Sequence, residues 1–159
     1  MPRRRIPLDD WLQEMTRVTR ELSGGALKFP ERRTLALPQS PAQHVGSYIA
    51  VMSAFDSMHV GLTTSSAGCR VLARSLLNAP GDEELSDAEV VDGVNELMNI
   101  VAGKVKARLA ANDGTMRLGL PMFLTTPVRL TERMERASDD VTFGPVQCRL
   151  LVFRERRAA

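Results

Sequence analysis

Residues 94–103 read VNELMNIVAG and form the middle of the longest helical pattern in the chain. At about 100° per residue, two lines of side chains run along opposite sides of this predicted helix. The apolar line predicts a face buried in the core and comprises Val94, Leu97, Val101 and Val105. The opposite line is polar and comprises Asp92, Glu96, Asn99 and Gly103. We therefore expect Glu96 and Asn99 to be exposed and to lie side by side.

The polar line contains two residues that do not favour a helix. Asparagine is a poor residue for a helix interior, and glycine costs about 1 kcal/mol relative to alanine there. Glutamate, lysine or alanine at Asn99 and Gly103 would give a more stable helix with an equally solvated surface. A plain solvated face is the alternative that geometry alone leaves open, but the residue types indicate a surface that another molecule approaches closely.

The segments around this helix predict an α+β fold with an antiparallel sheet. A capping box, Ser86-Asp87-Ala88-Glu89, begins the main helix, which we expect to run from about Asp87 to Ala111. Two further helices are predicted at 8–22 and, after a serine cap, from 65 or 66 to 78. Two β-like runs at 48–55 and 58–63, with a turn at Asp56-Ser57 between them, predict a hairpin.

The remaining segments are predicted to be extended or irregular. We expect a short strand at 34–37, extended chain at 116–129 interrupted by Pro121 and Pro127, a polar loop at 132–140, and a final strand at 146–153. No linker divides the 159 residues, so we predict a single domain over 1–159.

Composition argues against several classes of function. The net charge of +2, from 21 basic and 19 acidic residues, is too small to indicate nucleic-acid binding. The few metal-binding residue types, Cys69, Cys148, His44 and His59, are isolated, so the sequence predicts no metal site. No apolar run is long enough for a membrane span, and none follows the N-terminal arginines as in a secretory signal. We therefore expect a cytoplasmic protein that binds neither nucleic acid nor membrane.

The spacing of the polar line resembles the motif of a known family. Asp92, Glu96, Asn99 and Pro121 fit the pattern D/S-x3-E-x2-N-x21-P of the CheC/CheX/FliY family of chemotaxis phosphatases. The segment ELMNIVAGKVKARL looks like the CheX version of the motif helix, and GLPMFL resembles the strand that follows it. The earlier segment SSAGCRVLARSLL carries no second ExxN motif, so the resemblance is closest to CheX. It covers about residues 8–153 and implies a CheC-like fold.

The resemblance also implies an activity and a set of site residues. Members dephosphorylate the phospho-aspartate of a CheY-like response regulator in two-component signalling. Asn99 would position the attacking water, and Glu96 would pair with a lysine beside the phosphorylation site of the receiver domain. Asp92, Gly103 and Lys106 would contact the same partner. The protein would need no cofactor of its own, since Mg²⁺ is expected on the response regulator.

Two details of the resemblance concern the partner and the assembly. Met98 stands between Glu96 and Asn99 where relatives often have a small residue, and we expect its bulk to face the incoming partner. This leaves an alternative: a non-catalytic CheX-like domain that binds a receiver or another signalling partner. CheX relatives pair through their sheets, so we also expect a homodimer in which the apolar strand at 146–153 provides an edge.

Overall fold

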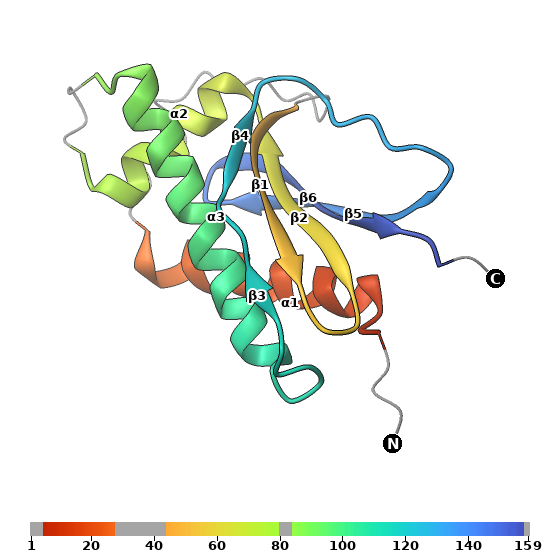
Figure 1. Cartoon of the computed structure of the whole chain (residues 1–159). Helices are drawn as coiled ribbons and strands as arrows, with labels where there is room; N and C mark the ends of the chain where they lie inside the picture. The colour runs from red at the N-terminus through yellow and green to blue at the C-terminus, as the bar shows by residue number, and fades with distance from the viewer. Residues whose placement is uncertain (1–4, 28–43, 80–83, 158–159) are drawn as a thin grey trace.

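The computed structural model describes residues 5–27, 44–79 and 84–157. In these ranges the chain forms three α-helices, a π-helical turn and six strands. The helices are α1 (Leu8–Glu21), α2 (Ser66–Leu77) and α3 (Asp87–Leu109), and the π-helical turn η1 (Leu22–Ala26) extends α1. The strands are β1 (Val45–Met52), β2 (Ser57–Thr64), β3 (Arg117–Leu118), β4 (Met122–Leu124), β5 (Met134–Phe143) and β6 (Val146–Glu155). The fold is α+β, as predicted (Figure 1).

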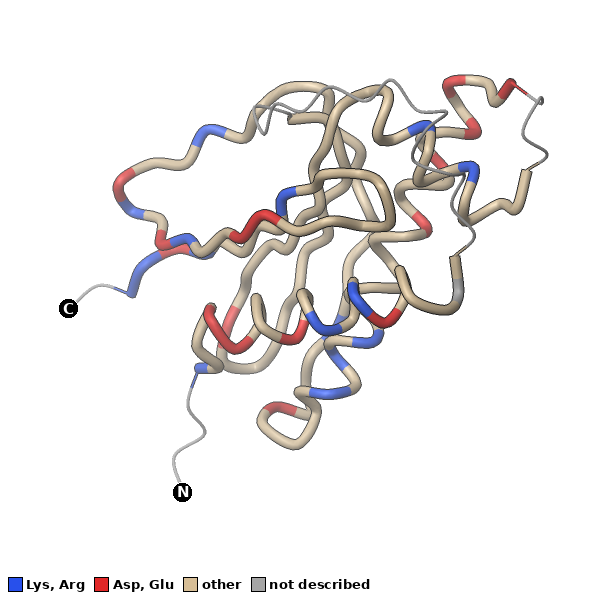
Figure 2. Tube along the Cα trace, turned by 180° about the vertical axis from the view of Figure 1, so that it is seen from behind, with Lys and Arg blue, Asp and Glu red and all other residues tan. Residues whose placement is uncertain are grey.

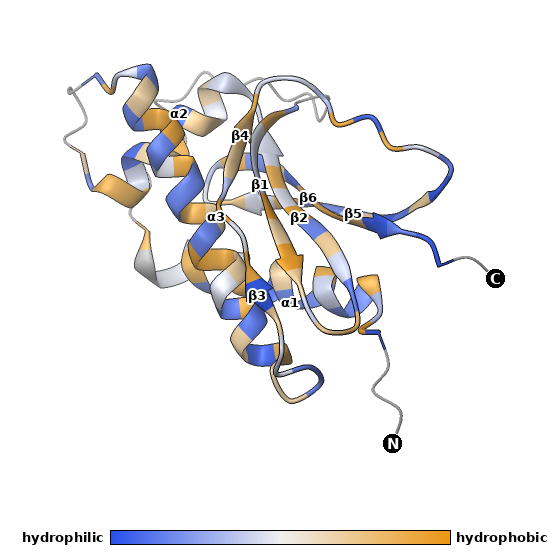
Figure 3. Cartoon of the chain, in the orientation of Figure 1, coloured by the Kyte–Doolittle hydropathy of each residue, from blue (hydrophilic) through white to orange (hydrophobic). Residues whose placement is uncertain are grey.

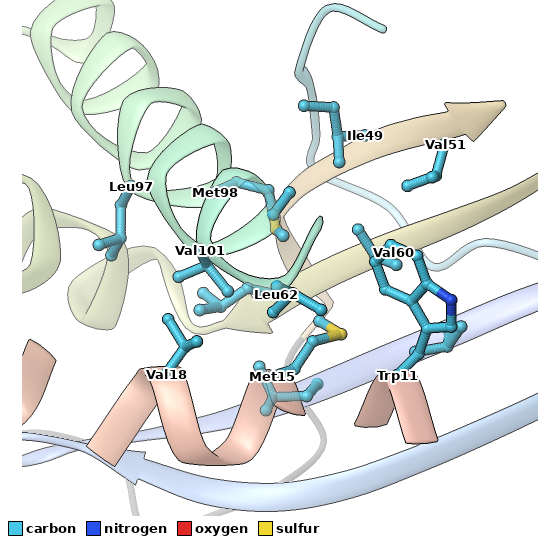
Figure 4. Packing of buried hydrophobic residues seen from close by; sticks show 14 of the residues in the cluster. Trp11, Met15, Val18, Ile49, Val51, Val60, Leu62, Leu97, Met98 and Val101 are labelled. Carbon is cyan, nitrogen blue, oxygen red and sulfur yellow. The ribbon is translucent and has the colours of Figure 1, made fainter. Parts of the chain in front are cut away.

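The six strands form one antiparallel sheet with the order β3-β1-β2-β6-β5, and β4 also pairs with β1. Successive side chains of a strand point to opposite faces of the sheet. One face holds core residues of neighbouring strands, such as Ile49, Val60 and Val152. Helix α1 packs on this face against β5 and β6, and α3 packs beside β1. Figure 4 shows side chains from both helices and from the strands meeting in this layer.

Aromatic side chains pack on the opposite face of the sheet. The ring of Phe153 stacks on His59 with centroids 5.2 Å apart, and Tyr48 meets Phe153 edge to face at 6.2 Å. The Tyr48 ring also lies over Gly61, where an added Cβ would come within 2.5 Å of it. In the part of the chain that the structure describes, α1 and α3 therefore share the face that forms the main core, away from this aromatic group.

The predicted start of α3 is confirmed in detail. The hydroxyl of Ser86 accepts a hydrogen bond from the Glu89 N–H at 3.2 Å, and the Glu89 carboxylate accepts one from the Ser86 N–H at 2.7 Å. This reciprocal pair satisfies two donors at the helix N-terminus. Hydrophobic and hydrophilic residues alternate in bands along α3 (Figure 3). The alternation is typical of a helix with one face in the core and one in solvent.

Several boundaries differ from the sequence-based expectation. Strand β1 begins at Val45 and ends at Met52, and the hairpin turn occupies 53–56, where the Ser53 N–H donates to the Asp56 carbonyl at 2.8 Å. The predicted polar loop at 132–140 is wrong, because most of this segment belongs to β5. Its side chains are mostly exposed, and pairing with β6 makes it a strand. The predicted strand at 34–37 lies outside the described residues.

The expectation that the last strand provides a free edge is also wrong. Strand β6 pairs with β2 on one side and with β5 on the other. Its apolar residues Leu150 and Val152 are fully buried in the core. The neighbouring β5 ends the strand order on this side and carries charged residues, which are typical of an edge strand.

Candidate functional site

The structure places the predicted catalytic side chains on the solvent face of α3. Glu96 and Asn99 are both exposed. The apolar line on the other side of the helix is at most 1% exposed at each of its members, Val94, Leu97, Val101 and Val105. The predicted opposition of a buried and an exposed line is therefore confirmed. The catalytic roles of Glu96 and Asn99 stay predictions.

The other predicted site residues share the same face of α3. Asp92 is exposed, and Gly103 and Lys106 are partly exposed. They lie four, seven or ten residues from Glu96 and Asn99, so the helical repeat stacks them along one side. The structure thus gathers the five residues into one continuous strip over about four turns of helix. We call Asp92, Glu96, Asn99, Gly103 and Lys106 the polar strip.

The two central side chains of the polar strip are not engaged within the protein. Among the described residues, neither Glu96 nor Asn99 has a hydrogen-bond or ion-pair partner. Arg108, on the same helix, differs because it forms ion pairs with Glu14 at 3.5 Å and with Glu21, which fasten α3 to α1. Glu96 and Asn99 are therefore available to another molecule.

The two glycines of α3 have opposite surroundings. A Cβ added at Gly93 would stand 2.7 Å from the Cβ and 3.0 Å from the Cα of Ala73 in α2, so Gly93 permits close packing of the two helices. A Cβ added at Gly103 would meet nothing within 4 Å beyond its own helix backbone and chain neighbours. Packing within the described residues therefore does not require a glycine at 103. The space above it is open to a partner.

Met98 does not face the partner side, and the expectation that its bulk would do so is wrong. The side chain is 1% exposed and belongs to the main hydrophobic cluster. Figure 4 shows it among the packed core side chains. At about 100° per residue, Met98 lies about 100° from both Leu97 and Asn99, and the core extends to its side of the helix. Met98 therefore contributes to packing and gives no support to the non-catalytic alternative.

The sequence analysis did not single out Asn95, which fixes α3 on the sheet. Its side-chain oxygen accepts a hydrogen bond from the buried hydroxyl of Ser47 in β1 at 2.7 Å. The available signal was a second asparagine in the helix interior, one turn before Asn99. The bond holds the polar strip at a defined height beside β1. Pro121, the last residue of the motif, lies between β3 and β4, the short strands that pair with β1.

Other kinds of site find less support in the described residues. Burial raises the pKa of Cys69 to about 12 and that of Cys148 to about 12, so neither thiol is a ready nucleophile at neutral pH. No three His, Cys, Asp or Glu residues of the described ranges are grouped to hold a metal ion. A hollow of about 500 Å³ lies between α1 and β5 and includes no residue of α3. The polar strip is thus an open helix surface, which suits a macromolecular partner better than a small molecule.

In the described residues, neither the distribution of charge nor the hydropathy of the helices indicates a further kind of site. Figure 2 shows acidic and basic residues interspersed over the back of the molecule. None of the helices in the described ranges is both long enough and apolar enough to cross a membrane.

Solved structures with this architecture define the class as a CheC-like α+β fold. The CheX–CheY–BeF₃–Mg²⁺ complex from Borrelia burgdorferi matches with a TM-score of 0.65 and 14% identity, over 97% of this chain and 100% of that chain. CheX from Desulfovibrio desulfuricans matches with a TM-score of 0.64 and 12% identity, over 91% and 95%. A CheC-like superfamily protein from Shewanella sp. PV-4 matches with 0.64 and 16%, over 92% and 96%.

The family follows from the sequence itself. The family model described as chemotaxis phosphatase CheX matches residues 45–142, more than half of the chain. The chain therefore belongs to the CheX family. The matched region contains β1, β2, α2, the whole of α3, β3, β4 and nearly all of β5. The search among curated proteins found no match.

Proposed function

We propose that this protein binds a CheY-like response regulator and hydrolyses its phospho-aspartate. The observation that carries the proposal is the exposed pair Glu96 and Asn99, which has no partner within the described protein and lies on the motif helix of a CheX-family chain. The solved complex of CheX with CheY, BeF₃ and Mg²⁺ from Borrelia burgdorferi supports a receiver as the partner class. A cytoplasmic location would bring the two proteins together.

Asn99 acts on the attacking water in this proposal. Water attacks phosphorus in line with the aspartyl oxygen, the P–O bond to that oxygen breaks, and the products are aspartate and inorganic phosphate. The step requires a water held at the right angle, and a carboxamide can donate and accept hydrogen bonds without adding charge. A carboxylate in the same place would repel the phosphoryl group. The Mg²⁺ that balances the phosphoryl charge belongs to the receiver.

The remaining residues of the polar strip position the receiver. Glu96 pairs with the lysine beside the phosphorylation site, and this ion pair orients the docked helix. Gly103 leaves room for the partner's backbone. Lys106 favours an acidic receiver surface, and Asp92 contributes a charge at the other end of the strip. None of these four residues takes or gives a proton in the reaction.

We also propose that the protein forms a homodimer. The apolar strand β6 lies inside the sheet, so association through this sheet would use a different strand. Strand β5 ends the described strand order and offers ten residues of backbone for pairing. Its charged side chains would restrict the register in which a second copy could pair.

The direct test mixes the purified protein with a panel of phosphorylated receivers and follows phosphate release. Binding is measured separately on each receiver activated with beryllium fluoride, a stable phosphoryl mimic. The proposal expects at least one receiver to bind and to lose phosphate faster than it does alone. Binding without faster phosphate loss would favour a non-catalytic receiver-binding domain over a phosphatase. If no receiver binds, both hypotheses are wrong.

A further inference from the structure

The edge of the sheet beside α3 contains a β-bulge. β3 pairs with β1 at Leu118–Val51, and β4 pairs with β1 at Met122–Tyr48. Between these two pairs β1 has two residues, Ile49 and Ala50. The opposing chain has three, Gly119, Leu120 and Pro121. The extra residue defines a bulge, a feature that often redirects side chains next to functional sites.

Contacts on both sides hold this bulge in place. The Gly119 N–H donates to the Ala50 carbonyl at 2.8 Å, and Leu118 packs against the main core cluster. Pro121 has no N–H, which suits a position that donates no hydrogen bond to the sheet. This explains the proline of the motif as a structural residue of the bulge. The segment is fixed relative to β1, and through β1 to α3.

Continued from β3, the alternation of side chains assigns Leu120 to the side of the sheet that carries α3. Leu118 lies opposite the buried Val51 on this face, and alternation returns Leu120 to it two residues later. Met122 lies opposite Tyr48, which is on the aromatic face. Without the extra residue, alternation would leave Leu120 and Met122 on the same face. The bulge therefore separates them.

Leu120 is also level with the polar strip. The Ser47–Asn95 hydrogen bond places residue 47 of β1 beside residue 95 of α3. From this point both elements run in the same direction, so distances along the two can be compared (Figure 1). The bulge lies opposite 49–50, about 8 Å further along β1 at about 3.3 Å per residue. On α3 the same distance is about five or six residues at about 1.5 Å each. This reaches residues 100–101, between Asn99 and Gly103.

Leu120 is unusually exposed for an apolar side chain in a segment that is hydrogen-bonded to the sheet. It is 90% exposed, whereas the other large apolar side chains exposed in the described ranges, Met52, Leu77 and Met122, are 48–53% exposed. Scattered exposed apolar residues are common and need no explanation by themselves. Leu120 differs because a fixed bulge presents it at the height of two unpartnered polar groups. Its side chain contributes little burial to the fold.

We propose that Leu120 is the apolar anchor with which this surface holds the phosphorylated receiver. The inference rests on the proposed function, because the same partner must cover Asn99 and Leu120. A receiver whose phosphorylated end meets Asn99 extends over the adjacent sheet edge, where an apolar depression on it would receive the leucine. A few side chains buried at the centre of an interface supply most of its affinity.

The test compares serine substitutions at three exposed apolar positions. Leu120→Ser should weaken binding of a beryllium-fluoride-activated receiver about tenfold or more, the effect expected for one buried leucine. The receiver concentration for half-maximal phosphate release should rise by a similar factor, with the maximal rate nearly unchanged. Met122→Ser, on the other face of the same edge, and Leu77→Ser, at the end of α2, should bind like wild type. Leu120→Ser should keep the wild-type unfolding temperature, since its side chain is 90% exposed, whereas the substitutions at the half-buried Met122 and Leu77 should each lower it by a few degrees without loss of the fold.

The outcomes separate this inference from the proposed function. If wild type binds and acts on a receiver while Leu120→Ser binds equally well, the anchor is refuted and the function stands. An equal loss in Met122→Ser or Leu77→Ser would also refute it, because the effect would not depend on the bulge. If Leu120→Ser changes the sedimentation mass and leaves receiver binding intact, a second copy of the chain covers the leucine. If wild type binds no receiver, both proposals fall together.

Discussion

Gly103→Ala should stabilise the protein, although it lies on the surface that we assign to partner binding. The added Cβ meets nothing within 4 Å, so no contact must move to admit it. Alanine is favoured over glycine in a helix interior by about 1 kcal/mol. For a chain of this size, such a gain raises the unfolding temperature by about 2–4 °C. Thermal unfolding followed by circular dichroism measures the shift.

Gly93→Ala is the matched control in the same helix. Its Cβ would meet Ala73 at 2.7 Å, and a methyl group on a packed helix cannot swing aside. Overpacking of this kind costs about 1–3 kcal/mol and outweighs the helical gain of about 1 kcal/mol. The same substitution should therefore destabilise the protein at 93 and stabilise it at 103.

Gly103→Leu tests whether the receiver covers this turn of α3. The larger side chain should leave the fold intact and should retain a gain of up to about 1 kcal/mol. It should obstruct a receiver that approaches the helix closely. If the obstruction resembles overpacking of a core, at about 1–3 kcal/mol, the dissociation constant should rise about 5- to 150-fold. Calorimetric titration with a beryllium-fluoride-activated receiver measures it.

Two results would refute this reasoning. A loss of stability in Gly103→Ala would show that the space above Gly103 is occupied within the protein. Unchanged receiver affinity in Gly103→Leu, with the wild-type fold retained, would show that the partner does not cover this turn of α3.

Glu96→Ala should raise the receiver concentration needed for half-maximal phosphate release more than it lowers the maximal rate, because Glu96 orients the partner; a loss confined to the maximal rate would contradict this. Burial lowers the pKa of His59, so the unfolded chain binds its proton more readily and stability should fall as the pH drops through about 6.5. His59→Phe should therefore show a smaller change in urea midpoint between about pH 7.5 and about pH 5.5, and an equal change would assign the pH dependence elsewhere. Sedimentation at high micromolar concentration should give the mass of two chains, and a single-chain mass would reject the homodimer.

The elements that local sequence could predict are those with a strong local signal. The capping box at Ser86 and the two opposed lines of α3 depend on spacing within one helix, and the structure confirms both. The inward direction of Met98 was not predicted, because it lies about 100° from both Leu97 and Asn99 and so borders both faces of the helix. Its burial depends on how far the core wraps around the helix.

Elements fixed by distant partners were harder to predict. The residues of β5 show no clear alternation of apolar and polar types, because this strand lies at an edge where nearly all of its side chains are at least partly exposed. Its ten-residue pairing with β6 decides its structure. β6 itself reads as an apolar strand in sequence, and only the sheet order shows that both of its sides are occupied. The bulge at Leu120 likewise becomes visible only when the residues between the β1–β3 pairs and the β1–β4 pairs are counted on both chains.

The measurement that tests the central claim most directly is phosphate release with Asn99→Ala at a saturating concentration of phosphorylated receiver. Because the contact between Asn99 and the water matters chiefly in the transition state, its loss should lower the turnover rate and leave affinity nearly unchanged. We predict that Asn99→Ala loses most of the catalysed rate and still binds the activated receiver, that Asn99→Asp is at least as impaired, and that the exposed control Asn112→Ala behaves like wild type. Equal rates of phosphate release for Asn99→Ala and wild type would contradict the claim.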